Sequence, residues 1–163
     1  MARLIRRARA DEAETLLLIQ REAAVAAFGH IFPPERYPFP DDDVLAGWRY
    51  ALADPDVEAY FAEVDRGAVG SLSIATDFLR TLFVLPSHWN QGIGSALHDF
   101  ALARLRKRGS KHAKLWTLEE AQAARRFYEK RGWRLSGERR VVPFPPNPID
   151  VAYTLDLEWR QSR

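Results

Sequence analysis

Residues 81–97 decide the fold; they read Thr-Leu-Phe-Val-Leu-Pro-Ser-His-Trp-Asn-Gln-Gly-Ile-Gly-Ser-Ala-Leu. The opening residues have the composition of a buried strand, which Pro86 ends because proline has no N–H for a central ladder. Gly92 and Gly94 let another backbone or an anion come close to the chain. From residue 94 to residue 108 the apolar residues recur with helical spacing. The sequence therefore predicts a helix N-terminus after a strand end, with unpaired N–H groups that can bind phosphate oxygens.

The glycine pair is also compatible with a plain tight turn. Two better-known phosphate loops fit badly. The chain has no Gly-x-x-x-x-Gly-Lys-Ser/Thr, which argues against a nucleoside-triphosphate loop. The dinucleotide fingerprint requires Gly or Ala in place of Leu97, and an acidic residue about 20 positions further on. The chain has Lys111 and Lys114 in that region instead.

A second segment, residues 115–133, helps to decide between these interpretations of the glycine loop. Together the two resemble the acyl-CoA site of the GNAT superfamily of N-acetyltransferases. That family has a strand ending Val-x-Pro, then Arg/Gln-x-x-Gly-x-Gly/Ala, and residues 84–94 keep this spacing with Trp89 in place of Arg or Gln. The second segment resembles the family's strand, short loop and tyrosine-bearing helix, followed by Gly and an aromatic residue. An Asn that often starts this helix is Ala121 here, which removes one contact to the pantetheine arm.

The resemblance implies a set of site residues. Acetyl-CoA would be the acyl donor, and Tyr128 would give a proton to the departing thiolate, since a phenol is a neutral donor at pH 7. From the residues alone, Tyr128 could equally be a packed helix aromatic beside Phe127, which we expect in the core. The resemblance also implies cofactor contacts along the pantetheine arm and around the pyrophosphate, at Phe83, Val84, Leu85, Gln91, Gly92, Ile93, Gly94, Ser95 and Ala96.

No general base can be named from the sequence. The candidates near predicted strand ends are Asp77, His88, Glu58 and Glu63. The other histidines are scattered without metal-ligand spacing, so we expect no metal. Basic residues cluster at 104–114 and 125–131, where a solvated helix face is the plain interpretation. In this architecture they would also flank the anion loop, and the most plausible phosphate contacts are Arg125, Arg126 and Lys130.

Composition sets the remaining bounds. A chain of 163 residues, 47% hydrophobic and 28% charged, fits one globular domain, and we expect residues 1–163 to form a single N-acetyltransferase domain. The absence of cysteine excludes disulfides, zinc–thiolate sites and thiol nucleophiles. The sequence shows no signal peptide or long apolar run, so we expect a cytoplasmic protein without a membrane partner. A net charge of +2 does not call for nucleic acid.

The order of elements predicts a mixed α/β (α+β) sheet, as in the GNAT-like acyl-CoA N-acyltransferase fold, with about seven strands and about four helices. Expected strands are residues 4–9, 57–64, 68–76, 79–85, 114–117, 133–142 and 149–157. Expected helices are residues 11–28, 42–52, 94–108 and 121–130. Asp11 should cap the first helix with Glu14 in capping-box spacing, and the face to be buried in part is Leu17, Leu18, Ala24, Val25 and Phe28.

The expected reaction is direct transfer of acetyl from acetyl-CoA to a primary amine of a small molecule, peptide or protein. In the family's fold, residues 29–43 and 142–148 would flank the acceptor, and both loops carry aromatics. Asp41, Asp42 and Asp43 could add an acidic rim suited to a cationic amine, or the prolines and aromatics could simply brace the loops. The alternative function is a non-catalytic acyl-CoA-binding sensor or regulatory module. Acetylation of aminoacyl-tRNA would depend on the basic clusters alone, and a homodimer is compatible with the resemblance.

Overall fold

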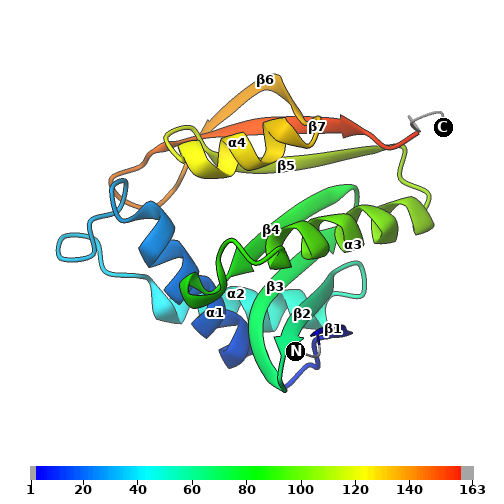
Figure 1. The fold of residues 1–163 in the computed structure, drawn as a ribbon. Coiled ribbons are helices and arrows are strands. Elements are labelled where there is room, and N and C mark those ends of the chain that lie inside the picture. Colours follow the sequence, from blue (N-terminus) through cyan, green and yellow to red (C-terminus); the bar gives the residue numbers. More distant parts are fainter. Residues whose placement is uncertain (1–2, 159–163) are drawn as a thin grey trace.

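The computed structural model describes residues 3–158, in which seven strands form one sheet in the order β1-β2-β3-β4-β5-β7-β6 (Figure 1). The strands are β1 (Arg3–Arg7), β2 (Glu58–Val64), β3 (Gly67–Ala75), β4 (Phe78–Val84), β5 (His112–Leu118), β6 (Arg134–Val141) and β7 (Ile149–Asp156). The helices are α1 (Ala13–Phe28), α2 (Asp41–Ala53), α3 (Ile93–Lys107) and α4 (Gln122–Lys130), with a 3₁₀ turn η1 (Pro86–His88). The predicted fold class and element order are confirmed.

The sheet divides between β4 and β5. Every other neighbouring pair is antiparallel, whereas β4 and β5 run parallel and share a single register pair, Phe78 with Lys114. Beyond that pair the two strands diverge, as Figure 1 shows. The backbone groups of β4 that face β5 there have no strand partner, so they must pair with other groups, as the Val84 carbonyl does with the Trp89 indole N–H.

Two hydrophobic clusters hold helices on opposite faces of the sheet. On one face, Leu16 and Ile19 of α1 and Trp48 of α2 pack with Phe61 of β2. On the other face, buried residues of α3 pack on β2, β3, β5 and β7, and Tyr128 of α4 packs against the same cluster. The open end of the divided sheet therefore has α1 on one side and α3 and α4 on the other. Within residues 3–158, no helix has the length and apolar content needed to cross a bilayer.

The predicted start of the first helix is wrong. Helix α1 begins at Ala13 without a side-chain cap, and Asp11 pairs with Arg9 instead. Glu12 organises this corner: its carboxylate accepts the Arg9 backbone N–H at 2.8 Å and two hydrogen bonds from Arg6 at 2.9 and 2.8 Å. Arg6 also donates to Glu63 at 2.8 Å, so a carboxylate at position 12 ties the helix start to the sheet edge.

The predicted buried face of α1 is only partly right: Leu17, Ala24 and Phe28 are half-buried as expected, but the fully buried residues lie elsewhere on the helix. Leu16, Ile19 and Ala23 are buried, whereas Leu18 is 45% exposed and Val25 is 38% exposed. Apolar residues run without interruption from position 16 to position 19, so periodicity could not fix which side of the helix meets the sheet. On the face of α1 that is only partly buried, Ala24, Val25 and Phe28 line a cavity described below.

The Glu12 contacts predict an acid-sensitive contribution to stability. Hydrogen bonds from Arg6, opposed by burial, lower the pKa of Glu12 from 4.5 to about 2. A carboxyl whose pKa is lower in the folded state stabilises the fold above pH 4.5, and this contribution is lost as pH falls through 2. We expect the free energy of unfolding to fall by about 3 kcal/mol from this group over that range. Urea titrations between pH 2 and pH 6 should show a flatter pH dependence for Glu12→Gln.

A matched control is Glu14→Gln, two residues further on in the first turn of α1, where the side chain is 80% exposed and lies 3.6 Å from Arg49. This variant should keep the wild-type pH dependence. Identical slopes for the wild type and Glu12→Gln would contradict the assignment.

Candidate active site

A cavity of about 920 Å³ occupies the divided part of the sheet. Its walls come from the end of β4, the loop before α3, the first turn of α3, the inner face of α4 and the C-terminal half of α1. The predicted site residues that line it are Phe83, Val84, Gly92, Gly94, Ser95 and Tyr128. The others do not: Leu85, Gln91, Ile93 and Ala96 lie outside the lining, and Ile93 is buried in the core. Residues far apart in the chain therefore meet where the resemblance placed a cofactor.

The two glycines of the loop differ in what the fold requires of them. Gly92 precedes α3 with φ +81°, a left-handed conformation that L side chains rarely adopt, and its carbonyl accepts the Ala96 N–H at 3.0 Å. Gly94 lies inside the helix, where an added Cβ would be 3.6 Å from the Phe127 ring and 3.9 Å from Val84, ordinary contact distances. The fold thus needs glycine at position 92, whereas glycine at position 94 keeps the cavity open beside the first-turn N–H groups.

Trp89 fastens this loop to the strand before it. The indole Nε1–H donates to the Val84 carbonyl at 2.7 Å, and the side chain lines the cavity while 41% exposed. The residue that stands where the family motif has Arg or Gln therefore supplies a neutral donor and an aromatic surface.

The cation of the site is Arg131, which the sequence prediction missed. Its guanidinium donates to Ser95 Oγ in the first turn of α3 and to the Phe127 carbonyl at 2.9 Å, and lies 3.6 Å from the Phe127 ring centroid. Arg131 lines the cavity, whereas the predicted Arg125, Arg126 and Lys130 do not. Arg125 instead donates to the Tyr153 hydroxyl at 2.9 Å and to a backbone carbonyl. The missed signal was spacing, since Arg131 follows the cavity residue Phe127 by four positions.

Tyr128 both packs and faces the cavity. Its ring makes edge-on contacts with Phe127, at 5.3 Å between centroids, and with Trp133 at 5.9 Å. Within residues 3–158 its hydroxyl makes no hydrogen bond to another residue, so it is free to donate to a ligand. Burial raises the pKa of Tyr128 above the usual 10, which keeps the phenol protonated at neutral pH.

Three of the four predicted base candidates lie elsewhere. Glu58 is buried and accepts from Arg104 at 2.9 Å and from Tyr60 at 2.6 Å, while Glu63 pairs with Arg6. Asp77 lies at the turn between β3 and β4, outside the cavity lining. Only His88 lines the cavity.

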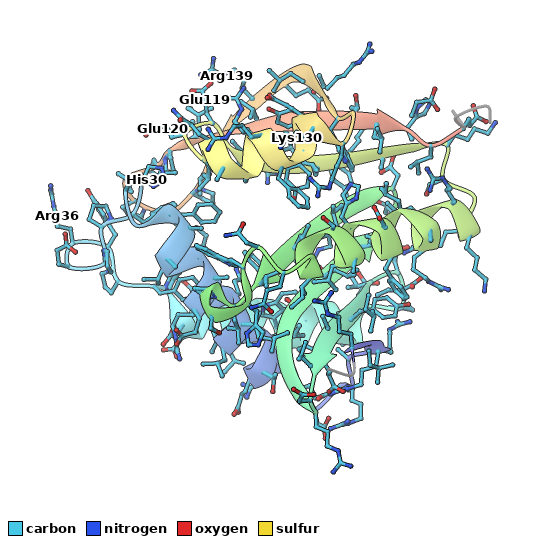
Figure 2. The ribbon with its side chains drawn as sticks, in the orientation of Figure 1. His30, Arg36, Glu119, Glu120, Lys130 and Arg139 are labelled. Carbon is cyan, nitrogen blue, oxygen red and sulfur yellow. The ribbon has the colours of Figure 1, made fainter. Side chains whose placement is uncertain are left out.

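Two further titratable residues, not singled out by the sequence, line the same cavity. His30 follows α1, Glu120 precedes α4, and both lie at one end of the molecule (Figure 2). His30 Nε2 lies 3.1 Å from the Glu120 backbone carbonyl, and because a carbonyl only accepts, Nε2 carries the proton. In the neutral ring Nδ1 is then left to accept a proton. This contact also joins the segment after α1 to the loop between β5 and α4.

Within the described part of the chain, no group of three or more His, Cys, Asp or Glu side chains is arranged to hold a metal ion. The chemistry this cavity can support with its own residues is anion binding and proton transfer. The first turn of α3 and Arg131 offer positive potential at one end, and His30, His88, Glu120 and Tyr128 offer proton donors and acceptors.

Comparison with known proteins places this geometry in a wider group. Residues 21–133 match the acetyltransferase (GNAT) family. An uncharacterized N-acetyltransferase of Archaeoglobus fulgidus is 28% identical over 141 residues, covering 80% of this chain and 92% of that protein.

Two solved structures share the fold. One is the PaiA N-acetyltransferase of Thermoplasma acidophilum in complex with coenzyme A, with a TM-score of 0.74 and 19% identity over 96% of this chain and 99% of that one. The other is yncA, a putative acetyltransferase from Salmonella typhimurium, with its cofactor acetyl-CoA; the TM-score is 0.71 and the identity 16%, covering 100% and 98% of the two chains.

Proposed function

Since the chain belongs to the acetyltransferase (GNAT) family and is an acyl-CoA-dependent acetyltransferase, we propose that it moves acetyl from acetyl-CoA to a primary amine by direct transfer. The observation that supports the proposal is the cavity between β4 and β5, which brings the N-terminus of α3 and the Tyr128 hydroxyl, without a hydrogen-bond partner among residues 3–158, to one space. These groups suit two parts of an acyl-CoA, the diphosphate and the thioester.

The residues present fit the donor. We propose that the first-turn N–H groups of α3, with Gly94 and Ser95, hold the pyrophosphate, and that Arg131 adds the positive charge. The pantetheine arm would lie along the part of β4 that faces away from β3, beside Phe83 and Val84, where backbone groups lack a strand partner. Bound in this way, the donor supplies a thioester whose carbonyl carbon is the electrophile.

The chain's own residues would handle the protons. An alkylammonium of pKa about 10.4 has no lone pair, so the acceptor must lose a proton before it attacks. His30 is our choice of base because its Nε2 is fixed on the Glu120 carbonyl, which leaves Nδ1 of the neutral ring, unpartnered among residues 3–158, to accept a proton; His88 is the second candidate. In the transfer the carbon–sulfur bond breaks as the carbon–nitrogen bond forms, and the Tyr128 hydroxyl gives its proton to the departing thiolate. The proton that the nitrogen releases as it becomes an amide returns to the Tyr128 phenolate through solvent. A cytoplasmic location and a homodimer stay predictions from the sequence.

Release of coenzyme A thiol from acetyl-CoA, measured with a broad panel of amines, tests the function. We expect amine-dependent release together with an acetylated product detected by mass spectrometry. Saturable acetyl-CoA binding without release of coenzyme A for any amine would contradict the proposed acetyl transfer. The alternative, a non-catalytic acyl-CoA sensor, would then be favoured.

Arg131 provides a specific check of the donor end. Arg131→Ala should weaken the binding of acetyl-CoA about tenfold, the effect of losing one charged hydrogen bond of about 1.5 kcal/mol. The control is Arg126→Ala, which removes an exposed cation from the same helix but not from the cavity lining. Calorimetric titration with acetyl-CoA measures both. Equal losses in the two variants would indicate a general charge effect in place of a contact at position 131.

A further inference from the structure

A second cavity, of about 500 Å³, adjoins the first. It lies between the loop after α1 and the loop that joins β6 to β7, and it shares Phe28 and Phe83 with the lining of the main cavity. A molecule bound in it would therefore have one end at the boundary with the proposed acetyl-transfer site.

The second cavity is lined mainly by aromatic, proline and aliphatic side chains. Its aromatic residues are Phe28, Phe32, Tyr37, Phe39, Phe83 and Phe144. Two loops, the one after α1 and the one after β6, supply most of these rings. Phe144, for example, is still 40% exposed. Binding a flat apolar group would remove the most apolar surface of these side chains from water, which is the main source of binding free energy here.

Two of the acceptor groups that line this cavity already have partners. Gln20 Oε1 accepts the Trp48 indole N–H at 2.8 Å, and Asp150, only 14% exposed, pairs with Arg140 at 3.1 Å. Arg36 lies at the outer edge of its loop (Figure 2), with its guanidinium carbon 5.6 Å from the Tyr37 ring centroid. A second cation on a ligand would thus enter a mainly apolar space whose one carboxylate, Asp150, is already paired with Arg140, which is costly.

The acidic rim suggested by the sequence is not part of either cavity. Asp41, Asp42 and Asp43 form the first turn of α2, and Asp41 pairs with Arg21 at 3.0 Å. Negative side chains are favourable at a helix N-terminus, which accounts for these aspartates without a ligand.

We infer that the acceptor is a primary amine carried on an aromatic group, an arylalkylamine, with the ring in the second cavity and the amine at the Phe28–Phe83 boundary. This inference rests on the proposed function and names its substrate class. Polyamines and lysine side chains in polar peptides are the acceptors that this lining disfavours.

The test compares kcat/KM for 2-phenylethylamine, ethylamine, spermidine and a lysine-containing peptide. We expect 2-phenylethylamine to exceed ethylamine by about 10- to 100-fold, the range set by apolar pockets. Phe32→Ala and Phe144→Ala should each lower that ratio severalfold without changing the affinity for acetyl-CoA. The control is Tyr50→Ala, which removes a 79% exposed aromatic outside both cavities and should leave the ratio unchanged.

The outcomes separate this inference from the proposed function. Acetylation of spermidine or the peptide at least as efficient as that of 2-phenylethylamine, with no change of ratio in either variant, overturns the aromatic class but keeps the acetyltransferase. If no amine is acetylated, the proposed function fails. An NMR chemical-shift titration with 2-phenylethylamine then tests whether the second cavity binds an arylalkylamine. Saturable shifts that weaken in Phe32→Ala and Phe144→Ala, but not in Tyr50→Ala, support an arylalkylamine site; their absence overturns it. Melting temperatures identify any variant that fails to fold, and the other variant then carries the test.

Discussion

Replacing Gly94 by Asp is expected to abolish acetyl-CoA binding while leaving the fold intact. At position 94, in the first turn of α3, an added Cβ meets only ordinary contacts, with the Phe127 ring at 3.6 Å and Val84 at 3.9 Å. The carboxylate would project into the cavity next to the N–H groups proposed to hold the pyrophosphate. Two like charges about 4 Å apart repel by about 4 kcal/mol at a partly shielded site. That penalty corresponds to a loss of about 1,000-fold in affinity.

Gly94→Asn is the matched control because it has the shape of Asp without the charge. It should lose part of the affinity through bulk, and Gly94→Ala should lose less still. Calorimetry with acetyl-CoA, with the melting temperature as a check of folding, measures all three variants. Affinity retained in Gly94→Asp would show that the diphosphate is not held at this turn, and the proposed donor site would be abandoned. Equal losses in Asp and Asn would show that bulk alone is responsible.

Local signals in the sequence were sufficient for most of the fold. Pro86 ends β4 at Val84 and starts η1, and Gly92 takes the left-handed conformation that precedes α3. These positions are decided by the backbone chemistry of proline and glycine, which neighbours cannot override. The orientation of α1 was not decided locally, since its apolar run offers two faces and only packing on the sheet selects one. The capping prediction failed for the same reason: Arg6 on a neighbouring strand attracts Glu12, a contact between segments that no local pattern contains.

The candidate site was predictable to the extent that it depends on motifs. Gly94, Ser95 and Tyr128 line one cavity although they come from two segments, as the resemblance implied. The cation was missed because the sequence gives the number of basic residues on α4 but not the direction in which each points. Arg125 points to Tyr153 on the sheet, and Arg131 points to Ser95 on α3. His30 was missed because its partner, the Glu120 carbonyl, is a backbone atom 90 positions away.

Substrate class depends on the parts of the chain that carry no periodic signal. The two loops that supply Phe32 and Phe144 are rich in proline, which in sequence predicts only irregular structure. Proline fixes the backbone and so can present rings at defined positions without a helix or strand beneath them. Prolines and aromatic residues that stabilise a loop can therefore also line a cavity. The sequence does not show that these two loops meet in space, so it could not distinguish the two roles.

Replacing Tyr128 by Phe is expected to lower kcat by about 100-fold or more, with little change in the affinity for acetyl-CoA. The variant keeps the ring contacts with Phe127 and Trp133 and removes only the hydroxyl, which makes no hydrogen bond to the described protein. A proton donor used only as the thiolate departs contributes to the transition state and not to binding. Since burial raises the pKa of Tyr128, the wild-type phenol stays protonated throughout a kinetic titration from pH 6 to pH 9. A plot of kcat against pH should therefore show the same loss of activity at low pH, caused by protonation of the general base, for the wild type and for Tyr128→Phe.

Tyr153→Phe distinguishes this loss from a structural one. The Tyr153 hydroxyl donates to Glu129 at 2.5 Å and accepts from Arg125 at 2.9 Å, and it lies outside the cavity lining. Removing it should lower the melting temperature, because two charged partners lose a hydrogen bond, while kcat stays within a fewfold of wild type. Tyr128→Phe should show the opposite pattern, with folding preserved and turnover lost. If Tyr128→Phe turns over as fast as the wild type, Tyr128 is a packing residue and the thiolate takes its proton from elsewhere, with His88 as the next donor to examine among the residues of the cavity.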